Sequence, residues 1–310
     1  MQLMPVSLAY FLEVARTGAV SEAAQNLRVA PSAISRQIAK LESGVGVPLF
    51  IRHPRGMTLT DAGSRLLAHA RRSEAESSAL LTELRTGSGA EEARNVTVAC
   101  SEGFARRLVP RAMAAFRHDH PDVTFQLDRV PHQEATRRVA EGIADIAVTY
   151  AMGPQHDVRV ECSAQVPMAA IVPPRHPLAG RERVGLAELC AHPLALPPAG
   201  TTHRDLFDIG VQMEGLTARP ALVCDALTPK YEFVRSGGGI ALVGDLGTLG
   251  DPHPDPGAEG VVYVPLDHPV FRHREAQVQT MLGRRLSWAA TQFSGLLVSL
   301  LCPAEPMPMS

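Results

Sequence analysis

The chain has 310 residues, of which 45% are hydrophobic and 20% charged, and its formal net charge is −2 at pH 7. This length allows two or three globular domains of ordinary composition. No apolar run is long enough to span a bilayer, and the N-terminus lacks the pattern of a signal peptide. The five scattered cysteines, without a Cys-x-x-Cys spacing, argue against a disulfide framework and a zinc site. We therefore expect a cytoplasmic protein without a membrane segment, metal or cofactor.

The first forty residues predict three short helices. The first carries its apolar residues at helical spacing and ends near Gly18, and the second begins near Ser21, whose hydroxyl can cap it. A turn over residues 28–30 leads to Pro31, which suits a first helical position because its missing N–H does no harm there. The buried stripes of the three helices are predicted to consist of Leu8, Phe11, Leu12 and Ala15, of Ala23, Ala24 and Leu27, and of Ile34, Ile38 and Leu41.

The third helix leaves short polar and basic side chains on its outer face. Small polar groups near a helix start can approach base edges in the DNA major groove, and longer basic side chains reach bases or phosphates. After this helix, residues 49–60 predict a two-stranded wing with a Pro/Gly turn. The predicted DNA-binding residues are Ser21, Pro31, Ser32, Ser35, Arg36, Gln37 and Lys40, with Arg52 and Arg55 of the wing on phosphate or in the minor groove.

This arrangement resembles the LysR-type transcriptional regulators. The motifs that carry the resemblance follow in the family's order and spacing, as Ala23-Ala24, Ser35-Arg36-Gln37-Ile38, Leu41-Glu42, Leu49-Phe50-Ile51-Arg52 and Leu59-Thr60-Asp61-Ala62-Gly63. One departure is Ala30-Pro31-Ser32, where many members have Ser-Gln-Pro. The glutamine that can contact a base is missing, so the base preference at that contact cannot be transferred.

Charge is divided unevenly along the chain. Residues 1–72 contain nine Lys or Arg and four Asp or Glu, a net charge of +5, whereas the remainder carries 21 basic and 28 acidic residues, a net charge of −7. A basic head can neutralise phosphates, and an acidic body cannot. A merely solvated basic face is the alternative, but it does not explain the coincidence with the helix-turn-helix.

Residues 61–86 predict one long amphipathic helix, followed by a hinge at Thr86-Gly87-Ser88-Gly89. Such a helix next to a small DNA-binding head is typical of dimers that read two half-sites. From Asn95 onward strands alternate with helices, which predicts parallel sheets flanked by helices. One final strand (276–282) and one final helix (286–301) close the pattern.

This body resembles the family's effector region, which is similar to the periplasmic binding proteins. The resemblance implies an α/β effector region of two lobes, joined by crossings near 165–167 and 266–270, preceded by an all-α winged helix-turn-helix domain and a linker helix. The expected boundaries are 1–60 for the head, 61–89 for the linker, 90–302 for the effector region and 303–310 for a disordered tail. Lobe 1 is expected at about 90–165 and 268–302, and lobe 2 at about 166–267.

Ligands of such sheets bind beyond the carboxyl ends of the strands, where helix N-termini point. This rule and the resemblance select an effector-binding set: Ser101, Glu102, His132, Tyr150, Thr201, Thr202 and Asp225. Hydroxyls and free N–H groups at helix starts suit a small carboxylate or another anion, and an aromatic effector is also compatible. Two observations weigh against an anion site: Ser101 and Thr202 equally suit plain N-caps, and Glu102 adds negative charge.

The resemblance implies a cytoplasmic regulator that binds interrupted-palindromic promoter DNA, responds to a small molecule and assembles as a dimer of dimers. As an activator it would also contact RNA polymerase. An enzyme is the competing class, but the chain lacks nucleotide-binding, nucleophile-elbow and zinc-protease motifs, and we assign no catalytic residue. Gly237-Gly238-Gly239 fits a helix stop, and Arg272-His273-Arg274 fits a solvated loop or subunit contact. A redox sensor using Cys100 and Cys224 is a further alternative, against which small buried cysteines are the simpler explanation.

Overall fold

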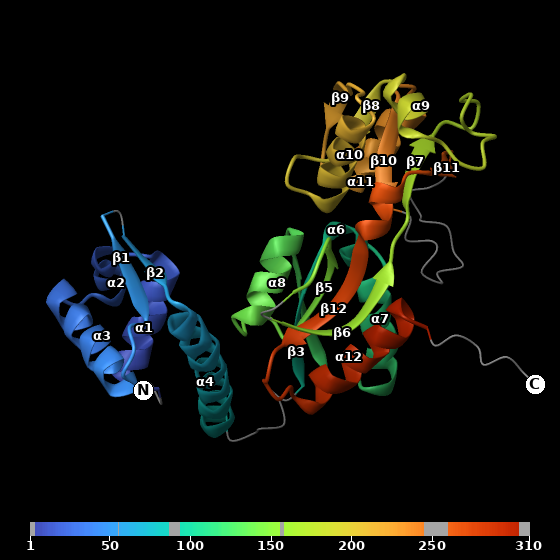
Figure 1. Cartoon of the computed structure of the whole chain (residues 1–310). Coiled ribbons are helices and arrows are strands. Elements are labelled where there is room, and N and C mark those ends of the chain that lie inside the picture. Colours follow the sequence, from blue (N-terminus) through green and yellow to red (C-terminus); the bar gives the residue numbers. More distant parts are fainter. Residues whose placement is uncertain (1–3, 55, 87–93, 156–157, 245–259, 304–310) are drawn as a thin grey trace, which may run out of the picture. The chain divides into compact units, whose positions relative to one another are not determined.

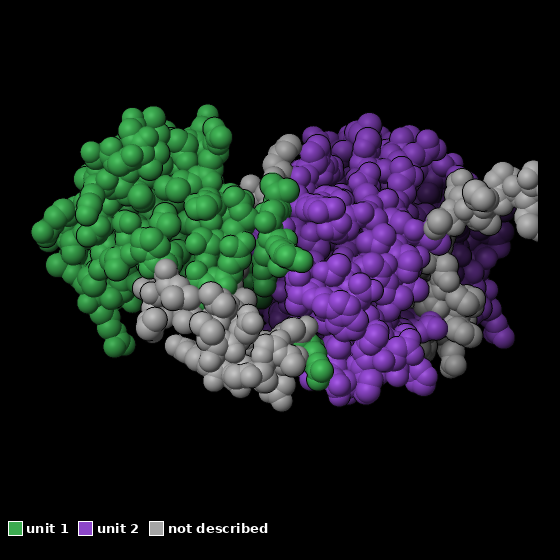
Figure 2. All heavy atoms as spheres, turned by 90° about the horizontal axis from the view of Figure 1, so that it is seen from below, with its two compact units in different colours: residues 1–94, 140–143, 282–285 green, residues 95–139, 144–281, 286–310 purple. Residues whose placement is uncertain are grey.

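The computed structural model describes residues 4–54, 56–86, 94–155, 158–244 and 260–303. Contacts divide the chain into two compact units (Figures 1 and 2). The first unit contains residues 1–94 with the short segments 140–143 and 282–285, and the second contains the remainder. Arg55, the predicted hinge at 87–89 and the tail from residue 304 lie outside the described residues.

The first unit is built on three helices: α1 (Val6–Thr17), α2 (Val20–Leu27) and α3 (Pro31–Val45). As predicted, α1 ends at a left-handed Gly18 and Pro31 opens α3. The turn before Pro31 holds Arg28 in the left-handed region with φ 55°. The buried core of this unit consists of Phe11, Val14, Ala23, Ala24, Ile34, Ile38, Leu49, Phe50 and Ala70.

The predicted cap at Ser21 is wrong. Helix α2 begins at Val20 after the extended residue Ala19, so Ser21 lies inside the first turn with its side chain exposed. No side chain caps this helix. A hydroxyl caps only from the residue that precedes the first helical one, where the chain has alanine.

The predicted wing follows α3 as an antiparallel pair, β1 (Phe50–His53) and β2 (Gly56–Leu59), and leads into the long helix α4 (Asp61–Thr86). The Glu42 side chain accepts the amides of Leu49 at 2.8 Å and Phe50 at 3.2 Å, which ties the end of α3 to the wing. At Gly63 the first turn of α4 meets backbone so closely that a Cβ would lie 2.1 Å from the Leu49 carbonyl oxygen. Glycine is therefore the residue that fits there.

The second unit contains two five-stranded sheets (Figure 1). In lobe 1 the strand order is β4-β3-β5-β12-β6, with β3 parallel to β4 and β5 and with β12 antiparallel to β5 and β6. The strands are β3 (Asn95–Cys100), β4 (Thr124–Arg129), β5 (Ile146–Ala151), β6 (Val158–Gln165) and β12 (Glu275–Met281). The helices are α6 (Glu102–Ala105), α7 (Leu108–Asp119), α8 (His132–Ala140) and α12 (Trp288–Leu301).

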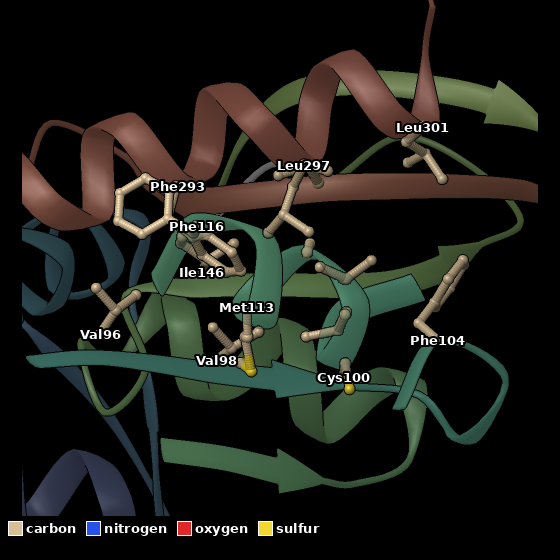
Figure 3. Close-up of a cluster of buried hydrophobic side chains, with 14 of the residues drawn as sticks. Val96, Val98, Cys100, Phe104, Met113, Phe116, Ile146, Phe293, Leu297 and Leu301 are labelled. Carbon is tan, nitrogen blue, oxygen red and sulfur yellow. The ribbon is translucent and has the colours of Figure 1, made fainter. Parts of the chain in front are cut away.

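Aromatic and aliphatic side chains of α7 and α12 form the core of lobe 1 against the sheet (Figure 3). The rings of Phe116 and Phe293 meet edge to face, with centroids 5.5 Å apart. Leu297 is wholly buried in the same cluster. This packing fixes β3 and β5, whose carboxyl ends carry Ser101 and Tyr150.

In lobe 2 the strand order is β11-β7-β10-β8-β9. The strands are β7 (Met168–Val172), β8 (Leu194–Leu196), β9 (Pro220–Val223), β10 (Ile240–Gly244) and β11 (Val262–Pro265). The helices are α9 (Leu186–Cys190), α10 (Thr202–Met213), α11 (Leu227–Arg235) and the 3-10 turn η2 (Pro269–His273). Two segments join the lobes, residues 166–167 between β6 and β7 and residues 266–274 between β11 and β12.

The structure corrects the sequence interpretation at three places. Each sheet is mixed rather than parallel, because β12 and β7 pair antiparallel with neighbours. Strand β6 was not expected, since its exposed residues alternate irregularly with buried ones. The sequence pattern favours one helix over residues 103–117, but the structure has two, α6 and α7, separated at residues 106–107.

Candidate functional site

Helix α3 presents a polar face outside the core of the first unit. Ser32, Arg36 and Lys40 are exposed, and Ser35 and Gln37 are half-buried at its border. Ile34 and Ile38 on the opposite side are almost wholly buried. The helix is therefore anchored by one face, and the predicted DNA-contacting side chains stand on the other.

Of the remaining predicted DNA-binding residues, Pro31 and Ser21 are exposed at the starts of α3 and α2, and Arg52 is exposed on β1. Within the wing, a ring nitrogen of His53 and the hydroxyl of Thr58 lie 2.9 Å apart across the two strands. The short wing thus has a side-chain contact that holds its strands together near Arg52.

The second unit contains a cavity of about 300 Å³ that residues of both lobes line. All seven predicted effector-binding residues lie on its wall. Lobe 1 supplies Ser101, Glu102, His132 and Tyr150, and lobe 2 supplies Thr201, Thr202 and Asp225. The positions selected from strand ends and helix starts are therefore brought together in space.

Only one of the three predicted serine and threonine hydroxyls acts as a plain helix cap. Thr201 precedes α10 and accepts the Arg204 amide at 3.4 Å. Ser101 precedes α6 but makes no capping bond, and its oxygen lies 3.0 Å from that of Thr149. Thr202 is inside α10, where its hydroxyl accepts Nε of Arg274 at 3.2 Å.

The acidic groups on or near the wall are paired or exposed. Glu102 forms an ion pair with Arg129 at 3.2 Å, so its negative charge is partly compensated. The Asp205 side chain, on the first turn of α10, accepts the Gly200 amide at 3.0 Å. Asp225 is exposed. The ion pair with Arg129 therefore weakens the argument that the charge of Glu102 would repel an anion from this site.

The sequence interpretation missed a buried lysine on the cavity wall. Lys230 of α11 is 3% exposed, and no hydrogen bond or ion pair of its ammonium occurs within the described parts of the chain. Burial lowers the pKa of Lys230 to about 8, against the opposing influence of Cys224, Asp225 and Glu102. From sequence alone, a lysine on a helix is expected at the protein surface. The fold instead buries the Lys230 side chain on the cavity wall.

Two histidines of the wall are held neutral. Burial lowers the pKa of His203 well below its usual value, and the charges of Arg274 and Lys230 lower it further. Burial also lowers the pKa of His132, with Asp205 acting in the opposite direction. At neutral pH these imidazoles offer a hydrogen bond donor and an acceptor rather than a charge.

The interpretation of Arg272-His273-Arg274 as a solvated loop or subunit contact is wrong for Arg274. Arg272 and His273 are exposed, but Arg274 is wholly buried at the junction of the lobes. Its guanidinium carbon lies 3.5 Å from the centre of the Tyr150 ring. Arg274 follows η2 with extended backbone and immediately precedes β12.

The cysteines give no support to redox sensing through Cys100 and Cys224. Burial raises the pKa of Cys100 to about 12, which disfavours the reactive thiolate. The Cys224 thiol donates to the Ala226 carbonyl at 3.6 Å. All five cysteines are free thiols.

Among the described residues, no helix is long and apolar enough to cross a membrane. No group of three or more His, Cys, Asp or Glu side chains there is arranged to hold a metal ion.

Comparisons with known proteins agree with this architecture. Residues 6–64 match the bacterial regulatory helix-turn-helix of the lysR family, and residues 89–301 match the LysR substrate binding domain. A RuBisCO operon transcriptional regulator of Allochromatium vinosum is 28% identical over 76% of this chain and 78% of its own length.

Solved structures show the same fold. A full-length OxyR variant from Pseudomonas aeruginosa covers 99% of this chain and 100% of its own, with 18% identity and a TM-score of 0.57. Full-length CbnR in complex with its target DNA covers 96% of this chain and 100% of its own, with 23% identity and a TM-score of 0.51. The two family matches together span nearly the whole chain, which therefore belongs to the LysR family of DNA-binding transcriptional regulators.

Proposed function

We propose that this regulator reads an interrupted palindrome in promoter DNA and that a small molecule bound between the lobes of its second unit changes that binding. The proposal of DNA binding rests on the polar, exposed face of α3. The opposite face of this helix is buried in the core, and the family to which the chain belongs binds DNA. The cavity lined from both lobes carries the ligand part.

In this proposal α3 enters the major groove. Ser32, Ser35, Arg36 and Gln37 meet base edges, and Lys40 meets phosphate. Pro31 and Ser21 lie close to the DNA backbone. Arg52 and Arg55 of the wing contact phosphate or the minor groove. The exposure of Arg36, Lys40 and Arg52 supports these roles, because none of the three has to leave a buried position to reach DNA.

The assembly in this proposal follows from symmetry. Two heads joined through their α4 helices hold two half-sites separated by a whole number of DNA turns. Pairing of effector regions then gives a dimer of dimers. As an activator the protein would also engage RNA polymerase.

The response to the small molecule rests on the two lobes. Ligand in the cavity stabilises one relative placement of the lobes over another, which shifts the population between two DNA-bound geometries. Ser101, His132, Tyr150, Thr202 and the other lining residues contribute to the ligand's surroundings. In this proposal the cavity binds the ligand, and we assign no chemical reaction to it.

The experiment is a genome-fragment binding selection with the full-length protein at physiological salt, read by sequencing. We expect enrichment of a few fragments that share an interrupted palindrome. Binding without enrichment that disappears steeply with salt would contradict sequence-specific recognition, since it would reflect phosphate contacts alone.

A matched pair of variants makes the selection specific to α3. The double variant Ser32→Ala/Arg36→Ala should lose the enriched sites. Arg117→Ala removes an exposed positive charge from α7 of the effector region and should keep them. Equal enrichment by both variants would remove α3 from the reading of bases.

A further inference from the structure

Arg274 has an unusual environment for a wholly buried arginine. Its Nε donates to Thr202 and its guanidinium stacks on Tyr150, but its two terminal nitrogens are buried without a hydrogen bond partner among the described residues. Burial lowers the pKa of Arg274, and the neighbouring Tyr150 phenol opposes that shift without giving either terminal nitrogen a well-formed hydrogen bond. Buried charges in proteins are normally paired. A partner for this cation is therefore missing.

The unpaired nitrogens lie next to the cavity wall at Gly244. A Cβ on Gly244 would be 2.8 Å from one terminal nitrogen of Arg274, 3.3 Å from the other and 2.9 Å from Nε2 of His203. Gly244, His203, Thr202 and Tyr150 all line the cavity. Gly244 is thus the cavity-lining residue beside which three side-chain nitrogens come together.

The buried side-chain charges near Gly244 are positive. The charges of Lys230 and Arg274 both lower the pKa of His203, so both cations lie near that ring. The acids that face them are Glu102, which is paired with Arg129, Asp205, which accepts the Gly200 amide, and the exposed Asp225. The enclosed charge has no enclosed counter-ion within the described part of the second unit.

The rest of the wall fits an organic body. Val130, Pro131, Pro197, Leu227 and Val243 contribute apolar surface to the cavity. Its volume of about 300 Å³ is at the lower end of the range of small-molecule sites. The site therefore combines a forked cation with a compact apolar wall.

We propose that Arg274 binds the carboxylate of a small organic acid, which is the effector class of this regulator. The planar guanidinium offers two parallel N–H groups, the geometry that a carboxylate accepts in bidentate fashion. Lys230 strengthens the binding through its charge, and the apolar wall holds the body of the acid. This proposal rests on the proposed effector cavity and specifies its ligand.

Arg274 also joins the two lobes. Thr202 belongs to lobe 2 and Tyr150 to lobe 1, and the guanidinium contacts both. A carboxylate on its terminal nitrogens reorganises a contact that spans the lobes. Because those nitrogens are enclosed, an acid reaches them only when the residues around them move. Binding at this residue is thereby coupled to lobe movement.

The test measures thermal unfolding of the full-length protein with butyrate, succinate and benzoate, each against its amide, and with sulfate and phosphate. We expect at least one acid to raise the unfolding temperature and its amide not to do so. In Arg274→Met and Gly244→Ala the affinity for that acid should fall roughly 10–100-fold, because each change removes or displaces the guanidinium.

Controls separate the site from general charge and glycine effects. Arg272→Met removes an exposed arginine two residues away, and Gly180→Ala adds a methyl where no atom lies within 4 Å. Both should bind the acid as the wild type does. If Arg274→Met fails to fold, Gly244→Ala still tests the site with the cation retained.

Four outcomes would overturn the proposal: equal stabilisation by acid and amide, full affinity in both Arg274→Met and Gly244→Ala, binding of sulfate or phosphate alone, or stabilisation by no acid. None of them touches the DNA selection, which uses no acid. Enriched operators with no acid binding would leave the proposed DNA function intact and remove only this ligand class.

Discussion

The two units of this protein place their functional cations in opposite surroundings. In the first unit Arg36, Lys40 and Arg52 are exposed, and the apolar core lies behind them. In the second, Lys230 and Arg274 are enclosed at the junction of two lobes. Exposed cations cost little to maintain and act through DNA phosphates and bases. Enclosed cations lose hydration, so a ligand that pairs with them gains the interaction that water would otherwise supply.

This difference predicts separable effects of substitution. Changes to the exposed face of the first unit should alter binding and leave stability almost unchanged, whereas changes behind that face or inside the second unit should alter stability as well. The following predictions test that separation, beginning with the largest effect.

The largest effect is expected behind the DNA-reading face, for Gly63→Val. A Cβ there would lie 2.1 Å from the Leu49 carbonyl oxygen, and this neighbour is backbone that cannot turn away. We expect a loss on the order of 3 kcal/mol in the stability of the first unit. Hydrogen exchange of α1–α3 should speed up while the two sheets of the second unit exchange as before.

Gly44→Val is the matched control, since Gly44 is also helical but has no atom within 4 Å of its added Cβ. It should leave exchange in α1–α3 nearly unchanged. Equal acceleration by the two variants would mean that valine in a helix, rather than the close approach of α4 to the wing, is responsible.

The second effect concerns the exposed face itself. Arg36→Ala should cost about 1–3 kcal/mol in DNA binding, with relaxed base preference if Arg36 reads a base, or a reduced salt slope if it contacts phosphate. Its unfolding temperature should stay the same because the side chain is exposed. Affinity for an enriched fragment at several salt concentrations distinguishes these results.

Arg117→Ala supplies the control for lost positive charge, as it does in the selection. An unchanged affinity, base preference and salt slope in Arg36→Ala would take Arg36 out of the interface. A drop in unfolding temperature would instead break the separation between binding and stability that the exposed surroundings imply.

The head could be predicted from sequence more fully than the cleft. Its elements follow from contacts near in sequence: Gly18 ends α1, Pro31 opens α3, and Glu42 reaches the amides of Leu49 and Phe50 seven and eight residues on. The cleft wall was predicted at strand ends, since those positions depend on topology alone. Arg274 was not, because its partners Thr202 and Tyr150 are brought to it by strand pairing across the whole second unit.

The third prediction addresses one of those long-range contacts. Thr202→Val removes the hydroxyl that accepts Nε of Arg274 and leaves a third buried nitrogen unpaired. We expect about 1.5 kcal/mol lower stability of the second unit and loss of the response to the stabilising acid, with DNA affinity intact. Unfolding temperature with and without succinate or benzoate, and affinity for an enriched fragment, measure these effects.

Thr201→Val is its neighbour control, because it removes the cap of α10 but not the contact to Arg274. It should lose some stability and keep the response. An unchanged response in Thr202→Val would mean that Thr202 is not required for the cleft to work.

The smallest effect is a pH dependence of the affinity for the acid. It tests whether burial in the second unit sets the charge of Lys230. Because burial lowers the pKa of Lys230 to about 8, its ammonium is charged at pH 7 and largely neutral at pH 9. An anion in the cavity favours the charged form, so its affinity should fall as pH rises through 8, by roughly three- to tenfold. In Lys230→Met the acid should bind more weakly and with equal affinity at pH 7 and 9. A step that persists in Lys230→Met would belong to another group and would place the working charge outside Lys230.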